Sequence, residues 1–472
     1  MSTTSPSTVR YGLDDRPPLR RAVPLGLQHV MVMMASNVTI PVILATAIGA
    51  SPEDTAFLVQ VALLVAGVAT LVQTLGLGPV GARLPIVQGT SFGFLVVSIP
   101  LAQQYGLAAV FGGALFAGLV QLVFGAVFSK IRRLFPPLVA GIVVLVIGIG
   151  LIPTGIQLFA GGAGAEDLGS LRNFAVATFV LVAILVLYRF GRGFIGAAAV
   201  LIGIIAGYAL ASGLGMVDWG RVNSAAWFSV PQPLQFGLEF PAAALIAMGA
   251  MAIATSIETV GDISALTKAG DERQPTTREM RGGLMGDGVG TAIAALFSAL
   301  PNTSFSQNVG LVAFTGVMSR FVVTIGAFFL VLSGFVPKLA MIIAVIPASV
   351  IGGAAVVMFG MIISAGISLL TTRPLTQNDL IIIAVSVVVG QGFAWRPEIA
   401  ANLPENVAAL MTSGIVPAAA IAIVLYSMKP KKERLLDVDT PLAGHFAEDE
   451  EHAATRADEG LAPRTTTEED DR

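Results

Sequence analysis

Three acidic residues stand inside long apolar stretches and are the first candidates for chemistry. Glu258 and Asp262 lie in segment 240–268, and Asp287 lies in segment 282–300. An acid at the middle of a membrane span costs roughly 2.5–3.5 kcal/mol, so an acid kept there is expected to be functional. Glu258 and Asp262 are four residues apart and share one helix face. Because burial beside a second acid favours the neutral carboxyl, these acids are candidates for binding and releasing a proton.

A polar segment, 301–320, follows the acids and carries the second group of candidates. Unpaired backbone groups in hydrocarbon cost several kcal/mol each, so such an interruption at membrane depth is expected only around a protein-lined cavity. Gln307 offers an acceptor and a donor side by side, a carboxylate such as Glu258 accepts N–H groups, and Phe92 can stack on a flat ring. These types favour a planar, neutral, hydrogen-bonding solute over a sugar, a lipid or a simple ion. We therefore predict a ligand site built from Gln307, Asn308, Glu258, Asp262 and Asp287.

Each candidate also has a purely structural interpretation. One or more of the acids could serve only to accept hydrogen bonds from backbone groups or a helix end, and Asp262 is expected near the end of its helix. Among the three histidines, His29 alone lies in the apolar region, next to Gln28. A hydrogen bond between helices and a supporting role near the ligand site explain this pair equally well.

The composition places these residues in a membrane protein. Of 472 residues, 55% are hydrophobic and only 12% are charged, against roughly 25% charged in a soluble domain. Apolar runs of about 20 residues recur from Val23 to Met428, as in a helical protein that crosses the membrane many times. The absence of cysteine excludes disulfides, thiolate catalysis and cysteine-bound metals.

The apolar runs predict an all-α polytopic protein with 14 membrane segments. Segments 3 and 10 are shorter and more polar than the others. The predicted ranges are 23–49, 55–78, 82–101, 107–128, 136–156, 171–189, 193–212, 240–264, 282–300, 301–316, 319–344, 347–370, 376–394 and 406–428.

Charged residues predict the orientation of these segments. Lys and Arg gather in alternate loops, for example at Lys130, at Lys268 and in 429–434, as the positive-inside rule requires of one face. Both termini are therefore expected in the cytoplasm. Residues 429–472 contain 13 acids and 7 bases and few aromatics, so we expect a disordered acidic tail.

Segments 3 and 10 share a Thr-Ser-Phe triplet, at 90–92 and at 303–305. The two segments are seven spans apart, so each occupies the same place in its half of the chain. An odd number of spans per half makes the second half inverted relative to the first, and interrupted segments at matching places indicate a transporter site. Pro, Gly and β-branched residues in 85–92 and 301–305 predict a short strand, followed by a half-helix whose free N–H groups face the middle of the membrane.

Four motifs resemble those of the nucleobase–ascorbate transporter family, the xanthine/uracil permeases. The most specific is Gln-Asn-Val-Gly at 307–310, followed by Thr315-Gly316. The others are Gln28-His29, Gln-Gly-Thr-Ser-Phe at 88–92 and Glu-Thr-Val-Gly-Asp at 258–262, and Asp287 falls on an acidic position of the family. The resemblance covers the chain from residue 23 to residue 428, in order and spacing.

This resemblance implies a fold of two inverted seven-segment repeats that form a core domain and a gate domain. It also implies proton-coupled uptake, an elevator-like movement, a homodimer in the plasma membrane, and no cofactor beyond the coupled proton. Neither enzymatic activity nor nucleic-acid binding is expected. The implied parts are a cytoplasmic arm (1–22), core domain segments (23–129 and 240–344), gate domain segments (130–239 and 345–428) and the tail (429–472).

The resemblance also assigns roles to individual residues. Glu258 and Gln307 would hydrogen-bond the base, Phe92 would stack on it, and Ser91 and the Ser306 backbone would line the pocket. Supporting and coupling roles would fall to His29, Asp262, Asp287 and Asn308, with Gln88 in the same group.

The substrate expected from these matches is a purine, xanthine or uric acid. Uracil carriers of the family resemble one another in having Glu, Arg and often His where this chain has Gln307, Gly316 and Asp262. The small Ser91 would leave room for the additional oxygen of urate. Uracil transport and an anion exchanger of the same fold are the alternatives, and a membrane enzyme has little to build catalysis from.

Overall fold

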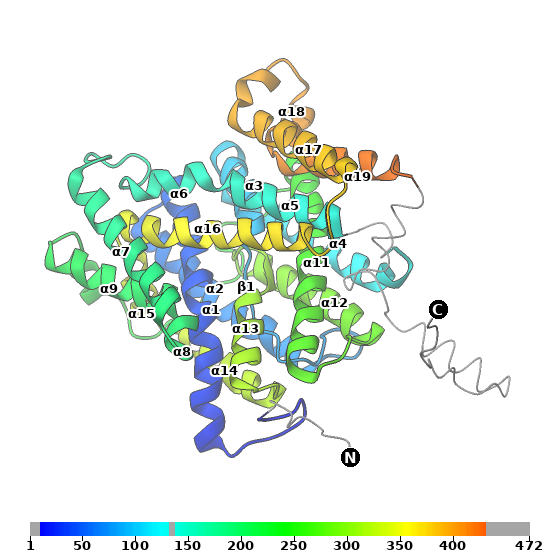
Figure 1. The fold of residues 1–472 in the computed structure, drawn as a ribbon. Helices are drawn as coiled ribbons and strands as arrows, with labels where there is room; N and C mark the ends of the chain where they lie inside the picture. The colour runs from blue at the N-terminus through cyan, green and yellow to red at the C-terminus, as the bar shows by residue number, and fades with distance from the viewer. Residues whose placement is uncertain (1–9, 132–136, 431–472) are drawn as a thin grey trace, which may run out of the picture.

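The computed structural model describes residues 10–131 and 137–430, which are mostly helical (Figure 1). The first half contains α1 (Leu19–Ala47), α2 (Pro52–Leu75), β1 (Gln88–Thr90), α3 (Phe92–Tyr105), α4 (Leu107–Ile131), α5 (Pro137–Gly150), α6 (Ile152–Phe159), α7 (Leu171–Phe190), α8 (Phe194–Ala197), α9 (Ala199–Gly213) and α10 (Trp219–Ser224). The second half contains α11 (Ala242–Asp271), α12 (Thr277–Leu296), β2 (Asn302–Ser304), α13 (Ser306–Thr315), α14 (Arg320–Ser333), α15 (Pro337–Ala344), α16 (Ala348–Leu370), α17 (Gln377–Trp395), the 3-10 turn η2 (Pro397–Ala400), α18 (Glu405–Thr412) and α19 (Ile415–Ser427).

Within the described residues, eight helices are long and apolar enough to cross a membrane, or nine if the bent pair α14 and α15 counts as one span. Shorter apolar helices are α3, α9 and α19. The high helix content agrees with the predicted fold class. The count of 14 segments and the inverted repeat stay predictions, because several predicted segments are not single straight helices.

The breaks in these segments have local causes. Predicted segment 136–156 shows only a short irregularity between α5 and α6, near Gly150 and with Pro153 in the first turn of α6, and Pro137–Phe159 still counts as one span. Predicted segment 319–344 bends by 83° between α14 and α15, where Pro337 begins the second helix. Proline has no N–H for the helical ladder and its ring clashes with the preceding turn, so the ladder ends before it.

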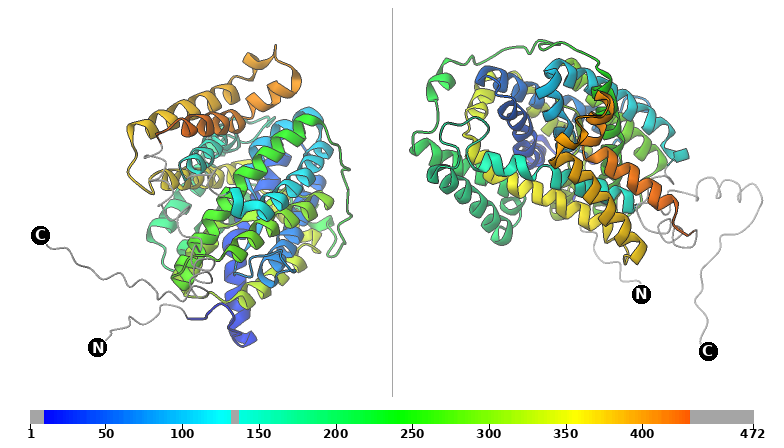
Figure 2. Two further views of the ribbon diagram at one scale, coloured as in Figure 1. Left: turned by 90° about the vertical axis from the view of Figure 1, so that its right-hand side faces the viewer. Right: turned by 90° about the horizontal axis from the view of Figure 1, so that it is seen from above.

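The helices pack in two groups. In one group α4 packs against α11 and α12, and α2 packs against α14. In the other group the long helix α16 packs against α5, α6 and α7, and α17 packs against α19. Helices α17, α18 and α19 lie together at the end of the molecule opposite α1 and α14 (Figure 1). The long connection from α9 to α11 runs along one face of the molecule (Figure 2).

Glycines allow the closest helix contact in the first group. A Cβ added to Gly288 of α12 would lie 2.5 Å from the backbone nitrogen of Leu122 and 2.7 Å from the carbonyl oxygen of Gly118, both in α4. Contacts this short exclude any side chain on Gly288. Small residues at such crossings let two helix backbones pack directly, which is a main source of stability between helices in lipid.

Strands β1 and β2 form an antiparallel pair near the middle of the molecule, where the register joins Gln88 to Ser304 and Thr90 to Asn302 (Figure 1). Each strand continues after one residue into a short helix, α3 or α13. The N-termini of these two helices therefore lie close together, as predicted from the broken third and tenth segments. Gly316 ends α13 in the left-handed conformation, with φ at +65°, which a glycine adopts without strain.

The two ends of the chain differ from their expected boundaries. Helix α1 begins at Leu19, and the preceding residues pack on the loop after α13: Arg10 and Tyr11 donate backbone hydrogen bonds to Gly316, and Arg320 pairs with Asp14 at 2.6 Å. At the other end, Lys429 is buried with its Nζ 2.7 Å from Asp379 of α17. Lys429 thus belongs to the folded part of the chain, and 431–472 of the predicted tail lie outside the described residues.

We predict that Gly288→Ala destabilises the protein, whereas Gly360→Ala does not. The added methyl group at Gly288 must push α4 away, and overpacking of this kind costs about 1–3 kcal/mol. Gly360 lies in α16 with no atom within 4 Å of its added Cβ, so alanine there should be neutral or slightly stabilising. Melting temperatures of the two purified variants in detergent test this, and equal values would show that the α4–α12 contact tolerates separation.

Candidate functional site

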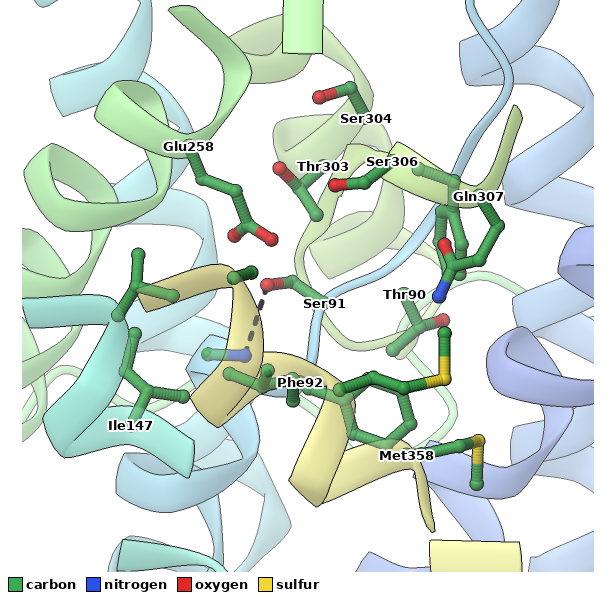
Figure 3. Close-up of a pocket in the computed structure, with 16 residues that line it drawn as sticks. Thr90, Ser91, Phe92, Ile147, Glu258, Thr303, Ser304, Ser306, Gln307 and Met358 are labelled. Atoms are coloured by element: carbon green, nitrogen blue, oxygen red, sulfur yellow. Dashed lines mark hydrogen bonds between the residues drawn. The ribbon is translucent and has the colours of Figure 1, made fainter. Parts of the chain in front are cut away.

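A cavity of about 210 Å³ lies where the two strands turn into α3 and α13 (Figure 3). One wall is polar and comes from the two strand-to-helix junctions and from α11. The opposite wall comes from α5 and α16 and consists of apolar side chains only: Val144, Ile147, Met358, Met361, Ile362 and Ala365. A ligand in this cavity would thus find all side-chain hydrogen-bonding groups on one side.

Glu258 and Gln307 face this cavity from opposite ends (Figure 3). Glu258 comes from the middle of α11, and Gln307 comes from the first turn of α13. Within the described part of the chain neither side chain has a hydrogen bond to protein, although each is partly buried. A partly buried polar group without a protein partner is available to a ligand.

The other three residues predicted to bind the ligand also line the cavity, but their side chains are already engaged. Ser91 Oγ accepts a hydrogen bond from the Gly93 N–H at 3.2 Å and so caps α3. Ser306 Oγ donates to Asp262 Oδ1 at 2.6 Å. The ring of Phe92 packs edge-to-face with Phe359 of α16, with ring centres 5.8 Å apart, so its orientation is fixed.

Asp262 lies behind the polar wall and fixes its shape. Its carboxylate accepts hydrogen bonds from Ser304 Oγ of β2 and from Ser306 Oγ at the start of α13, each at 2.6 Å. The residue is 8% exposed and does not line the cavity. Asp262 therefore joins α11 to the junction between β2 and α13, one helical turn from Glu258.

Asp287 is completely buried beneath the strand pair and accepts three hydrogen bonds. Gln73 Nε2 of α2 donates at 2.9 Å, Gln88 Nε2 of β1 donates at 2.7 Å, and the hydroxyl of Thr259 in α11 is the third donor. Charge-assisted hydrogen bonds of this kind are among the strongest in proteins. Asp287 thereby connects four elements, and the structure places it outside the cavity.

His29 and Asn308 form a second buried connection, between α1 and α13. Asn308 Nδ2 donates to the carbonyl oxygen of Pro85 at 2.7 Å, so its Oδ1 is the atom that contacts His29 Nδ1. A carbonyl oxygen only accepts, and therefore the hydrogen of the His29 ring is on Nδ1. Neither side chain lines the cavity.

Comparison with known proteins places the chain in a family. A sequence model described as "Permease family", that of the xanthine/uracil permeases, matches residues 20–399. The chain belongs to the nucleobase–ascorbate transporter family. It is a multi-pass membrane permease and not an enzyme.

Two characterised relatives and one solved structure illustrate the range of similarity. The permease is 37% identical to the xanthine permease of Bacillus subtilis over 409 residues, which are 86% of this chain and 93% of the relative. It is also 37% identical to the uric acid permease PucJ of the same organism over 419 residues, 87% and 93% of the two chains. The murine Slc26a9 anion transporter in its inward-facing state shares only 10% identity, with a TM-score of 0.61 over 88% of this chain and 69% of that one, so it shows a common fold alone.

Several residues of the site were missed by sequence reasoning. Gln73 anchors Asp287 and also accepts the Ala82 N–H through its Oε1 at 2.9 Å. It is a polar residue inside an apolar span, so the signal used for the acids could have found it. Met358 and Met361 gave no such signal, because apolar residues at helical spacing are expected in any span. Thr90 and Thr259 stand within recognised motifs but received no role.

We predict that Asp287→Ala strongly reduces the amount of folded permease. The change leaves two buried amide donors and a hydroxyl without an acceptor, and each such group costs about 1–3 kcal/mol. Ser333→Ala is the control, because that hydroxyl bonds only to a carbonyl of its own helix. Folded yield and melting temperature after extraction measure the effect, and a wild-type result for Asp287→Ala would show that the three donors find other partners.

Proposed function

We propose that this permease carries a purine nucleobase, xanthine or uric acid, across the plasma membrane. The observation that supports this most directly is the pair Glu258 and Gln307, which face one cavity and have no hydrogen bond to any of the residues that the structure describes. The names of the relatives, a xanthine permease and a uric acid permease, agree with the proposal.

The chemistry of the polar wall suits an oxidised purine. The Gln307 amide presents a donor beside an acceptor, which complements the N–H and C=O groups on a lactam edge. The Glu258 carboxyl, when it carries the coupled proton, presents an O–H donor beside a carbonyl acceptor and can therefore pair with a C=O or an N–H group of the base. The fixed ring of Phe92 supplies an aromatic surface for a flat heterocycle, while the first turns of α3 and α13 direct backbone N–H groups toward the cavity.

The alternatives fit the residues less well. Gln307, Gly316 and Asp262 all depart from the pattern expected of a uracil carrier. Likeness to an anion transporter rests on the fold alone, at 10% identity. The choice between xanthine and urate depends on space near Ser91, which is a small side chain.

The proposed coupling ion is the proton, and Glu258 is the proposed site of coupling. A proton and a base would bind from outside and leave together inside the cell. Binding of the two must be mutually favourable, since a proton that does not change the affinity for substrate cannot drive its transport. Glu258 is the only carboxylate that lines the cavity among the described residues, so it is placed to interact with both.

The proposed movement is that of an elevator between a core domain, formed by 23–129 and 240–344, and a gate domain, formed by 130–239 and 345–428. The packing of α2, α4, α11, α12 and α14 in one group and of α5, α6, α7 and α16 in another is consistent with this division. Cytoplasmic termini and a homodimer belong to the same proposal.

A competition assay tests the substrate. We expect the purified permease in proteoliposomes to accumulate labelled xanthine, and unlabelled xanthine and urate to compete, because both present the lactam edge that Gln307 complements. Uracil also has a lactam edge, but the chain departs from the pattern of uracil carriers at Gln307, Gly316 and Asp262, so uracil should compete poorly. If urate neither enters nor competes, the substrate is restricted to xanthine. If uracil is the best competitor, the assignment to purines is contradicted. If no base is taken up, the proposal as a whole is contradicted.

Replacement of Glu258 tests the coupling. With an acidic exterior, wild-type uptake should exceed the uptake at equal pH, whereas Glu258→Gln should only equilibrate xanthine because its amide cannot bind the proton. Exchange of labelled for unlabelled xanthine at equal pH needs no net proton movement and should persist, at reduced affinity. Glu239→Gln, the same change at an exposed residue, is the control. Normal accumulation by Glu258→Gln would exclude this acid as the coupling site.

A further inference from the structure

The polar residues that line the cavity divide into two classes. Four have their hydroxyl groups engaged within the protein: Ser91 with the Gly93 N–H, Thr303 with Thr259, and both Ser304 and Ser306 with Asp262. Three have no hydrogen-bond partner among the residues that the structure describes: Glu258, Gln307 and Thr90. Glu258 and Gln307 are the two side chains already proposed to hold the base, and the third was not predicted to have a role.

Thr90 is the most deeply buried of these three. It is 1% exposed, and its Oγ1 is a buried polar atom without a hydrogen-bond partner. Other buried polar atoms in the described part of the chain also lack a partner, for example on Gln88, Gln121 and Asn302, but Thr90 alone among them belongs to a residue that lines this cavity. A buried hydroxyl without a partner is energetically unfavourable, and a ligand that supplies the partner removes that penalty.

The backbone around Thr90 is held on both sides. Its N–H donates to Asn37 Oδ1 of α1 at 2.8 Å, and its strand partner is Asn302 of β2. The next residue, Ser91, donates its N–H to the carbonyl oxygen of Pro301 at 2.9 Å. Because a β-branched side chain has few rotamers on a fixed backbone, the hydroxyl is confined before any ligand arrives. Figure 3 shows it on the same side of the cavity as the Gln307 amide.

We propose that Thr90 Oγ1 is a third hydrogen-bonding group for the substrate, and that it bonds an oxo group, or the ring nitrogen beside one, that differs between purines of different oxidation pattern and so sets the preference among them. The proposal rests on purine transport as proposed above. A hydroxyl both donates and accepts, so it suits either a carbonyl oxygen or an N–H at the edge of the base. A site that hydrogen-bonds one such group discriminates against the analogue that lacks it.

Valine at position 90 removes the hydroxyl and keeps the shape of the side chain. Because the hydroxyl has no protein partner, Thr90→Val breaks no internal hydrogen bond and should fold as well as the wild type. Serine keeps the hydroxyl. Thr39→Val is the matched control, since Thr39 is a buried threonine whose hydroxyl bonds to the Ala35 carbonyl of its own helix, away from the cavity.

The experiment measures inhibition constants of urate, xanthine and hypoxanthine against labelled xanthine in proteoliposomes. These bases differ by one oxygen at a time. For Thr90→Val we expect the inhibition constant to rise roughly three- to tenfold for each base that carries the atom bonded by the hydroxyl. For a base that lacks this atom, the constant should change by less than about twofold. Thr90→Ser and Thr39→Val should show the same order of the three inhibition constants as the wild type, and the same ratios between them.

The outcomes separate this inference from the proposed function. A uniform loss across the three bases, or no loss, overturns the role of Thr90, since either result means that the hydroxyl bonds no group by which the bases differ. If Thr90→Val lowers the melting temperature, Thr90→Ala must reproduce the same base-dependent pattern for the role to stand. Absence of purine uptake by the wild type overturns the proposed function instead.

Discussion

The structure depends on the burial of backbone and side-chain polar groups at a depth where water cannot satisfy them. Two extended segments meet in the middle of the molecule, and their mutual hydrogen bonds satisfy only one edge of each. Side chains of neighbouring helices accept hydrogen bonds from other strand N–H groups. Asn37 accepts from the Thr90 N–H, Thr70 from the Gln88 N–H, and Thr291 from the Asn302 N–H. Irregular backbone is possible here because α1, α2 and α12 each provide a side chain at the required place.

Asp287 and Asp262 extend the same principle from backbone to side chains. One carboxylate collects donors from α2, β1 and α11 beneath the strands, and the other collects hydroxyls from β2 and α13 at their edge. Thr259 lies between them, in contact with Asp287 and with the hydroxyls of Thr303 and Ser304. The polar wall is thus one continuous network. Glu258, Gln307 and Thr90 stand out because the hydroxyl groups of the other polar residues that line the cavity are paired.

Much of this arrangement could be predicted from the sequence, for physical reasons that differ between residues. An acid in an apolar span is costly, so Glu258, Asp262 and Asp287 could be identified as candidate site residues. Proline and glycine within a span predict the two strands. Hydrogen-bond partners that are distant in the sequence could not be predicted, because nothing in the sequence near Asp287 indicates that Gln73 will be its donor. The division of the serines and threonines into engaged and free hydroxyls depends on distances of a few tenths of an ångström, which only the folded chain defines.

The apolar wall of the cavity has a mechanical consequence for the proposed movement. All side-chain hydrogen-bonding groups at the cavity lie on 90–91, on α11, on β2 and at the start of α13, whereas α5 and α16 present only aliphatic and thioether side chains. If the first set travels with the base, no hydrogen bond to the substrate has to break while the cavity slides past α16. Dispersion contacts are weak individually and almost independent of direction, so contacts with this wall add little to the energy barrier of the movement. Methionine suits such a wall because its flexible side chain can adapt to the changing shape of the surface that moves past it.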